Sequence, residues 1–132
     1  MKKQLNQVLQ FHKIFGAFIS LKSTSKIPQN VKDSRIKLIR EETEELIKAI
    51  QKEGIREIAK ELSDVLYVVL GTAISFGLQN NFSQVFIDVH KSNLSKIDKK
   101  GNFQLTNDKS KILKGKNYIK PELEYILEEN EK

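Results

Sequence analysis

Apolar residues recur three or four positions apart in three long segments of the chain, which is the spacing of one face of an α-helix. The first segment covers about residues 2–21, and its inner face consists of Leu5, Val8, Leu9, His12, Phe15 and Ile19. The second covers about residues 30–52 and ends before Gly54, and the third covers about residues 55–76. The pattern predicts a protein built mainly from helices.

The third segment changes character along its length. Its first half is polar, but from Val65 onward it is apolar on nearly every side, which is typical of a helix surrounded by others. Its small residues let neighbouring helices approach closely: Gly71, Thr72, Ala73 and Ser75. The apolar run of 65–76 is well short of the roughly 20 residues that cross a bilayer. We therefore expect a core helix here.

A shorter fourth helix follows the turn signals at residues 77–81, with an apolar stripe at Phe82, Val85, Phe86 and Val89. Asn93 and Lys96 continue this stripe with polar side chains. Beyond residue 98 the pattern weakens, which indicates a loop or small hairpin, and Pro121 can open a last helix. The prediction is an all-α, four-to-five-helix bundle in one domain of residues 1–132, with its core at about 4–97 and the loop and last helix at 98–132.

Composition and charge narrow the function. The chain contains no cysteine, which excludes disulfides, thiolate catalysis and cysteine metal sites. The first residues show no signal-peptide pattern, so we expect a cytoplasmic protein without a membrane partner. The chain has a net charge of +6, but residues 41–64 form an acidic block that contains eight acidic and four basic residues. A protein that binds cations with carboxylates and polyphosphate with lysines would show this charge pattern. An ordinary solvated surface would show it as well.

Two pairs of carboxylates stand out within the acidic block. Glu42 and Glu45 share one helix face, and Glu61 and Asp64 share another. The first pair falls inside the apolar stripe of its helix, where a charge needs a cation or hydrogen bonds to offset its desolvation. Single glutamates in such helices are mostly solvated. The two pairs together predict a metal site.

The ligand chemistry favours Mg²⁺ or Mn²⁺, which prefer oxygen donors. Neither histidine follows a glutamate by three positions, as di-iron bundles require, since Leu9 precedes His12 and Ile87 precedes His90 at that spacing. Mg²⁺ usually completes its coordination with substrate phosphates. The pattern therefore indicates hydrolysis of a di- or triphosphate.

Fifteen residues separate Glu41-Glu42-x-x-Glu45 from Glu61-x-x-Asp64. This motif resembles that of the all-α nucleoside triphosphate pyrophosphohydrolase superfamily, the superfamily of MazG, dimeric dUTPase and phosphoribosyl-ATP pyrophosphatase. The resemblance covers about residues 8–123 and is closest to the small MazG-like, dUTPase-related branch. It also rests on Phe11-His12-x-x-Phe15-Gly16, Asp64-Val65-Leu66-Tyr67, Val89-His90-x-Ser92-Asn93-x-x-Lys96 and Lys114-Gly115-x-Asn117-Tyr118-x-x-Pro121.

The resemblance implies the metal site and the reaction. The metal ligands would be Glu42, Glu45, Glu61 and Asp64, and Glu41 would be the general base for the attacking water. The reaction would split the α–β phosphate bond of a nucleotide such as dUTP or a non-canonical triphosphate, with phosphoribosyl-ATP the less favoured substrate. A homodimer or tetramer is implied too.

Six residues are candidates for holding the nucleotide. By resemblance, Lys96 and Lys114 would meet phosphate, and Asn93 and Tyr118 would meet sugar or base. From their position on the first helix, His12 and Phe15 are candidate walls of the base pocket, although His12 could equally be a hydrogen-bonded core residue. Two other functions stay open: a non-catalytic nucleotide-binding regulatory module, and a basic nucleic-acid-binding protein, which would leave the buried glutamates unexplained.

Overall fold

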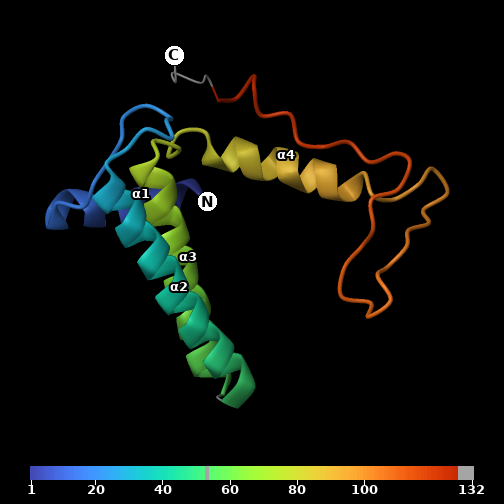
Figure 1. Cartoon of the computed structure of the whole chain (residues 1–132), viewed down its shortest axis with the longest axis horizontal. Coiled ribbons are helices and arrows are strands. Elements are labelled where there is room, and N and C mark those ends of the chain that lie inside the picture. Colours follow the sequence, from blue (N-terminus) through green and yellow to red (C-terminus); the bar gives the residue numbers. More distant parts are fainter. Residues whose placement is uncertain (53, 128–132) are drawn as a thin grey trace. The chain divides into compact units, whose positions relative to one another are not determined.

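The computed structural model describes residues 1–52 and 54–127. This part of the chain contains four helices, α1 (Lys2–Phe15), α2 (Gln29–Lys52), α3 (Ile55–Ser75) and α4 (Phe82–Leu94), shown in Figure 1. The described residues form no strand, only an isolated antiparallel bridge between Leu105 and Ile112. The predicted all-α class is confirmed.

The contacts within the chain divide it into two compact units. Among the described residues, unit 1 comprises residues 1–80 with α1, α2 and α3, and unit 2 comprises residues 81–127 with α4 and the segment after it. Each unit is described by itself below. The interpretation of residues 1–132 as a single domain stays a prediction.

Helix α1 buries part of the face that its sequence predicts and ends earlier than expected. Leu5, Val8 and His12 are buried, but Phe15, which the pattern placed on the same face, is 70% exposed. Gly16 ends the helix with φ 71°, a left-handed conformation that glycine adopts without a steric penalty, and the Ala17 amide bonds the His12 carbonyl at 3.0 Å. The prediction that this helix continues to residue 21 was therefore wrong.

The segment between α1 and α2 is bonded to the C-terminal end of α3. The Ser20 amide donates to the Ile74 carbonyl at 3.2 Å, the Thr24 amide donates to the Phe76 carbonyl at 3.1 Å, and Gln79 Nε2 donates to the Ser20 carbonyl at 2.9 Å. These bonds satisfy carbonyls that a helix end would otherwise leave unpaired. This segment therefore forms part of the packed end of unit 1.

Helices α2 and α3 lie alongside each other (Figure 1). At one end of the pair, the Arg35 guanidinium donates from Nε to Thr72 Oγ1 at 3.1 Å and from Nη2 to the Val68 carbonyl at 2.8 Å. A Cβ on Gly71 would lie 2.6 Å from Arg35 Nη2 and 3.0 Å from His12 Nε2. The glycine therefore makes room for both side chains, as its position among small residues predicted.

Unit 2 buries a face of α4 that the apolar stripe did not predict. Asp88 and Ser92 are buried, whereas Phe86 and Val89 are exposed. The reason is a polar contact with the C-terminal segment, because the Tyr125 hydroxyl donates to Asp88 Oδ2 at 2.6 Å. This bond offsets the desolvation of the carboxylate.

The remainder of unit 2 follows the predicted loop or small hairpin. The Thr106 amide donates to the Lys111 carbonyl at 2.8 Å, and the Leu113 amide donates to the Gln104 carbonyl at 2.8 Å. The predicted last helix is a turn at residues 124–126 in the described part, and residues 128–132 of that prediction lie outside it. None of the described helices combines the length and apolarity that crossing a bilayer requires.

Candidate metal centre

Three of the four predicted metal ligands come together between α2 and α3. Glu42 and Glu45 lie on α2, and Glu61 lies on α3. One carboxylate oxygen from each lies within 4.8 Å of the others, and we call this set the carboxylate cluster. Glu42 and Glu45 meet because they are three positions apart on one helix, as the sequence indicated. Glu61 joins them because α2 and α3 pack side by side.

Two oxygens of the cluster are buried without a hydrogen bond. Glu42 Oε2 and Glu61 Oε2 have no partner among the residues that the structure describes. Burial raises the pKa of Glu42, and the nearby charges of Glu45, Asp64 and Glu61 raise it further. A folded protein rarely leaves carboxylate oxygens in this state, and a hard cation with oxygen ligands would offset it. The residues present therefore fit the Mg²⁺ or Mn²⁺ that the sequence predicted.

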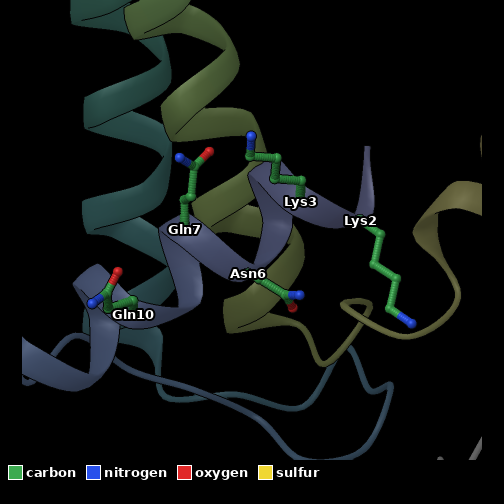
Figure 2. Close-up of a pocket in the computed structure, with 5 residues that line it drawn as sticks. All are labelled: Lys2, Lys3, Asn6, Gln7 and Gln10. Carbon is green, nitrogen blue, oxygen red and sulfur yellow. The ribbon is translucent and has the colours of Figure 1, made fainter.

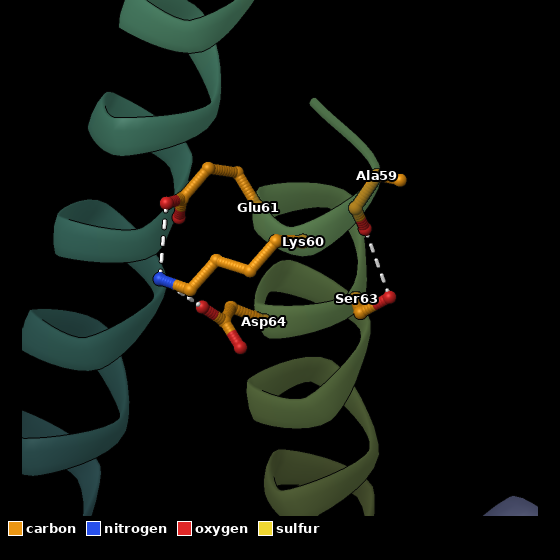
Figure 3. Close-up of polar contacts among 5 residues, drawn as sticks. All are labelled: Ala59, Lys60, Glu61, Ser63 and Asp64. Carbon is orange, nitrogen blue, oxygen red and sulfur yellow. Dashed lines mark hydrogen bonds and ion pairs between the residues drawn. The ribbon is translucent and has the colours of Figure 1, made fainter. Parts of the chain in front are cut away.

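Asp64, the fourth predicted ligand, lies next to the cluster but is held by a lysine. Figure 3 shows Lys60 Nζ between two carboxylates, 2.9 Å from Asp64 Oδ2 and 3.0 Å from Glu61 Oε1. On another part of the helix surface, the Ser63 hydroxyl donates to the Ala59 carbonyl at 2.9 Å. Asp64 contributes to the raised pKa of Glu42 and is therefore close to it, but it is not one of the three clustered side chains.

Glu41, the predicted general base, lies on α2 outside the carboxylate cluster. Its side chain is 53% exposed, and its Oε1 lies 3.9 Å from Lys37 Nζ one helical turn earlier. An exposed pair of this kind holds its carboxylate only weakly. Glu41 is therefore free to reach a water molecule, and its catalytic role stays a prediction.

The two aromatic candidates on α1 occupy different environments. His12 is 2% exposed, and its Nδ1 lies 3.1 Å from the Phe18 carbonyl. Burial lowers its pKa. This geometry favours the hydrogen-bonded core histidine over a pocket wall. Phe15 is exposed and packs on Phe11 with ring centroids 4.6 Å apart, while Phe11 meets Tyr67 of α3 edge to face at 5.6 Å.

The candidate phosphate-binding residues form a group of their own within unit 2. Lys114 Nζ lies 4.8 Å above the centre of the Tyr118 ring, a cation–π contact. Hydrogen bonding with the Ser92 side chain lowers the pKa of Tyr118, and the charges of Lys114 and Lys96 lower it further. The fold thus brings together two lysines and a tyrosine that are separated by up to 22 positions. Asn93 is exposed near the end of α4.

A hollow along α1 does not coincide with this chemistry. Figure 2 shows that its lining is polar and comes from a single helix: Lys2, Lys3, Asn6, Gln7 and Gln10. It contains none of the predicted site residues. Amide and lysine side chains cannot hold a hard cation in the way that carboxylates do. We therefore place the candidate site at the carboxylate cluster rather than at this hollow.

The fold and the cluster define a class of protein: an all-α protein with acidic residues on two adjacent helices. The chain belongs to the phosphoribosyl-ATP pyrophosphohydrolase family, whose sequence profile it matches over residues 8–93. The resemblance to the all-α pyrophosphohydrolase superfamily is thereby confirmed. The chain is also 34% identical over 96 residues to an uncharacterised protein of Acanthamoeba polyphaga mimivirus, in an alignment covering 70% of this chain. The alignment spans 35% of that relative's length.

Sequence reasoning missed two residues that touch the candidate sites. Lys60 pairs with Asp64 and could have been found from its position four residues earlier on the same helix. Ser92 is buried beside Tyr118, a contact between α4 and a loop that no local pattern indicates.

Proposed function

We propose that the chain is a nucleotide pyrophosphohydrolase that requires Mg²⁺ or Mn²⁺. The observation that carries this proposal is the pair of buried, unpartnered oxygens on Glu42 and Glu61 within a three-carboxylate cluster of the described residues. The family match supports the same reaction, since its description names a pyrophosphohydrolase.

The proposed metal ligands are Glu42, Glu45 and Glu61, with Asp64 as the fourth. Mg²⁺ or Mn²⁺ held by these residues would supply positive charge beside the phosphate oxygens. The carboxylates orient the phosphate end of the nucleotide by fixing where that charge lies. The burial of one oxygen each on Glu42 and Glu61 strengthens the interaction.

Glu41 accepts the proton in the proposed reaction. A water molecule attacks the α-phosphorus, its proton moves to the Glu41 carboxylate, and the bond from the α-phosphorus to the bridging oxygen breaks. The products are a nucleoside monophosphate and pyrophosphate. The weak pairing of Glu41 with Lys37 supports this role, because a base held in a tight ion pair would be a poorer proton acceptor.

Lys96 and Lys114 bind phosphate groups in this proposal, and Tyr118 and Asn93 meet the sugar or base. The cation–π contact of Lys114 supports a shared role for the lysine and the tyrosine, because it fixes the position of the ammonium. Phe15 is a candidate surface for the base, since its ring is exposed, whereas His12 is buried and serves as a core residue. The proposed substrate is a (deoxy)nucleoside triphosphate such as dUTP or a non-canonical triphosphate.

We also propose a homodimer, or a tetramer built from such dimers, in the cytoplasm. Several large apolar side chains of α2 and α3 are exposed within unit 1, among them Ile36, Ile47, Ile50, Leu62 and Leu66. Exposed apolar patches commonly mark protein–protein interfaces. Analytical ultracentrifugation across a range of concentrations tests this proposal, and a monomer at every concentration would contradict it.

The reaction is tested by measuring pyrophosphate release from a panel of nucleotides with Mg²⁺ or Mn²⁺. The panel contains the four ordinary deoxynucleoside triphosphates, dUTP, oxidised and methylated triphosphates, and phosphoribosyl-ATP. We expect release with at least one of them, and kcat/KM ratios across the panel identify the preferred base. Turnover of phosphoribosyl-ATP alone would contradict the proposed substrate class but not the reaction.

Two variants test whether the proposed ligand and the proposed base are needed for the reaction. Glu42→Gln should lower kcat at least 100-fold by removing a ligand, and Glu41→Gln should lower kcat 100-fold or more by removing the base. Glu44→Gln, an exposed glutamate on the same helix, is the matched control and should retain wild-type activity. Nucleotide binding without turnover in the wild type would instead assign a non-catalytic nucleotide-binding module.

A further inference from the structure

Lys60 is the cation closest to the carboxylate cluster among the contacts of the described residues. Its ammonium lies 3.0 Å from Glu61 Oε1 and 2.9 Å from Asp64 Oδ2 (Figure 3). Asp64 follows Lys60 by one helical turn, a spacing at which side chains meet, whereas Glu61 is its direct neighbour in the sequence. The contact with Glu61 therefore depends on the length and flexibility of the lysine side chain.

This contact divides the four predicted ligands. Glu61 gives one oxygen to Lys60, and its other oxygen is buried without a partner among the described residues. Asp64 gives Oδ2 to Lys60 and is not one of the three side chains whose oxygens meet within 4.8 Å. A positive charge thus already occupies the side of the cluster where Asp64 lies.

Lys60 can leave this position without disturbing the core. Its side chain is 64% exposed, while that of Glu61 is 15% exposed. Because most of the lysine side chain is exposed, its ammonium can move into water by rotation of that side chain. The two carboxylates raise the pKa of Lys60 through their hydrogen bonds, so the group stays charged across the physiological range.

We propose that Lys60 is an internal counter-ion of the carboxylate cluster that competes with the divalent cation. It holds Asp64 Oδ2 and Glu61 Oε1 when no divalent cation is bound, and it must release Asp64 Oδ2 before that oxygen can become a ligand. This inference rests on the proposed function, which supplies the divalent cation. Two consequences follow: Lys60 weakens the affinity for divalent cations, and it reduces repulsion among the carboxylates in their absence.

The sign of the effect distinguishes this role from a supporting one. If Lys60 only oriented Asp64 and Glu61 as ligands, its removal would weaken cation binding, as the loss of outer-shell partners usually does. If it competes, its removal leaves the acidic site with one more uncompensated negative charge and strengthens cation binding.

The experiment measures the Mn²⁺ dissociation constant of the full chain by electron paramagnetic resonance of free Mn²⁺. We expect Lys60→Met to bind Mn²⁺ about tenfold more tightly than the wild type, and Lys60→Arg, which keeps the charge, to stay close to the wild type. The matched control is Lys37→Met, which removes the same charge from the exposed pair with Glu41 on α2 and should change the constant less than about twofold.

A double-mutant cycle tests whether Lys60 acts through Asp64. In an Asp64→Asn background, the gain in the free energy of Mn²⁺ binding from Lys60→Met should fall to less than half of the gain in the wild-type background. With EDTA present, Lys60→Met should also lower the unfolding temperature relative to the wild type, and saturating Mn²⁺ should remove that difference.

Three results would overturn the inference: an unchanged or weaker affinity in Lys60→Met, an equal gain in Lys37→Met, or an undiminished gain in the Asp64→Asn background. Each of them leaves the proposed function standing, provided that the wild type binds Mn²⁺ and Glu42→Gln does not. If the wild type and Glu42→Gln bind no Mn²⁺ at all, the proposed metal site itself is wrong.

Discussion

The two ends of the α2/α3 pair differ in the kind of polar group that they bury. At the end where α1 and the loop join, Arg35 bonds Thr72 and the Val68 carbonyl, and His12 lies 3.1 Å from the Phe18 carbonyl. The buried atom without a partner at this end, among the described residues, is the neutral amide oxygen Oε1 of Gln79. At the other end, Glu42 and Glu61 each bury an oxygen without a hydrogen bond from the described residues.

This difference indicates that the packed end of the pair stabilises the fold and that the carboxylate end lowers its stability. The packed end contains the buried residues Leu70, Ala73 and Ile74, whereas Ala49 is the buried apolar residue of α2 among those described. Like charges held together in a partly desolvated place lower stability. A protein that keeps such a cluster therefore gains something from it other than stability, and the proposed cation binding would account for that gain. Four changes test this contrast.

Gly77→Ala should be the most damaging change at the packed end. Gly77 has φ 74°, and a Cβ there would collide with the Lys22 carbonyl. We expect a loss of about 3 kcal/mol or more in the free energy of unfolding, measured by urea titration. Gly16→Ala is the control, because Gly16 has φ 71° but a Cβ would meet no described atom within 4 Å. It should cost about 1–2 kcal/mol, and equal losses would show that packing at Gly77 is unimportant.

Saturating Mn²⁺ should stabilise the carboxylate end. At a concentration 100 times the dissociation constant, binding to the folded state alone adds about 2.7 kcal/mol. Thermal melts with Mn²⁺ and with EDTA measure this as a rise of several degrees in the unfolding temperature. Glu42→Gln and Glu61→Gln should lose the rise, and Glu44→Gln should keep it. A rise that persists in Glu42→Gln would place the cation elsewhere.

Glu42→Gln should increase stability when EDTA is present, by about 1 kcal/mol at pH 7.5. The pKa of Glu42 is raised in the folded protein, mainly by burial, so the folded state disfavours its ionised form. The wild type therefore gains stability as the pH falls through that raised value, and the variant does not. Melts at pH 7.5 and pH 5 give both quantities, and a less stable variant at pH 7.5 would contradict the contrast between the two ends.

Replacing His12 should have the smallest effect on stability. The contribution of His12 decreases as the pH falls, which is opposite in sign to that of Glu42. Burial lowers its folded-state pKa, so the unfolded chain binds the proton more readily. Its contribution to stability is complete above about pH 6.5 and is lost as the pH falls toward the lowered value. His12→Gln should be less stable than the wild type at pH 7.5 but should lose less stability between pH 7.5 and pH 5. The exposed His90→Gln should follow the wild type, and an identical pH dependence in His12→Gln would refute the effect.

Local patterns were sufficient for α2 and α3 and for two of the three residues of the carboxylate cluster. Apolar spacing predicted α2 and α3 closely, and Gly54 separated them as expected. The same spacing placed Glu42 and Glu45 on one face. It failed on α1, where Gly16 ends the helix although apolar residues continue at helical spacing beyond it. The periodicity describes which face would be buried, but the backbone conformation at Gly16 decides where the helix ends.

The stripe on α4 shows a second reason for failure. Phe86 and Val89 match the apolar pattern yet are exposed, and Asp88 is buried because Tyr125, thirty-seven positions later, donates a hydrogen bond to it. A pattern read from one segment contains no information about a partner that arrives from another. The group of Lys96, Lys114 and Tyr118 depends on the same kind of contact.

Residue types and their spacing within one helix were enough to predict the helical class, the two carboxylate pairs and the oxygen-ligand chemistry. They did not predict that Glu61 joins Glu42 and Glu45, that Asp64 is held by Lys60, or that two glutamate oxygens are buried without partners in the described part of the chain. Burial and pairing depend on which side chains meet across helices, and packing sets these contacts rather than position in the chain.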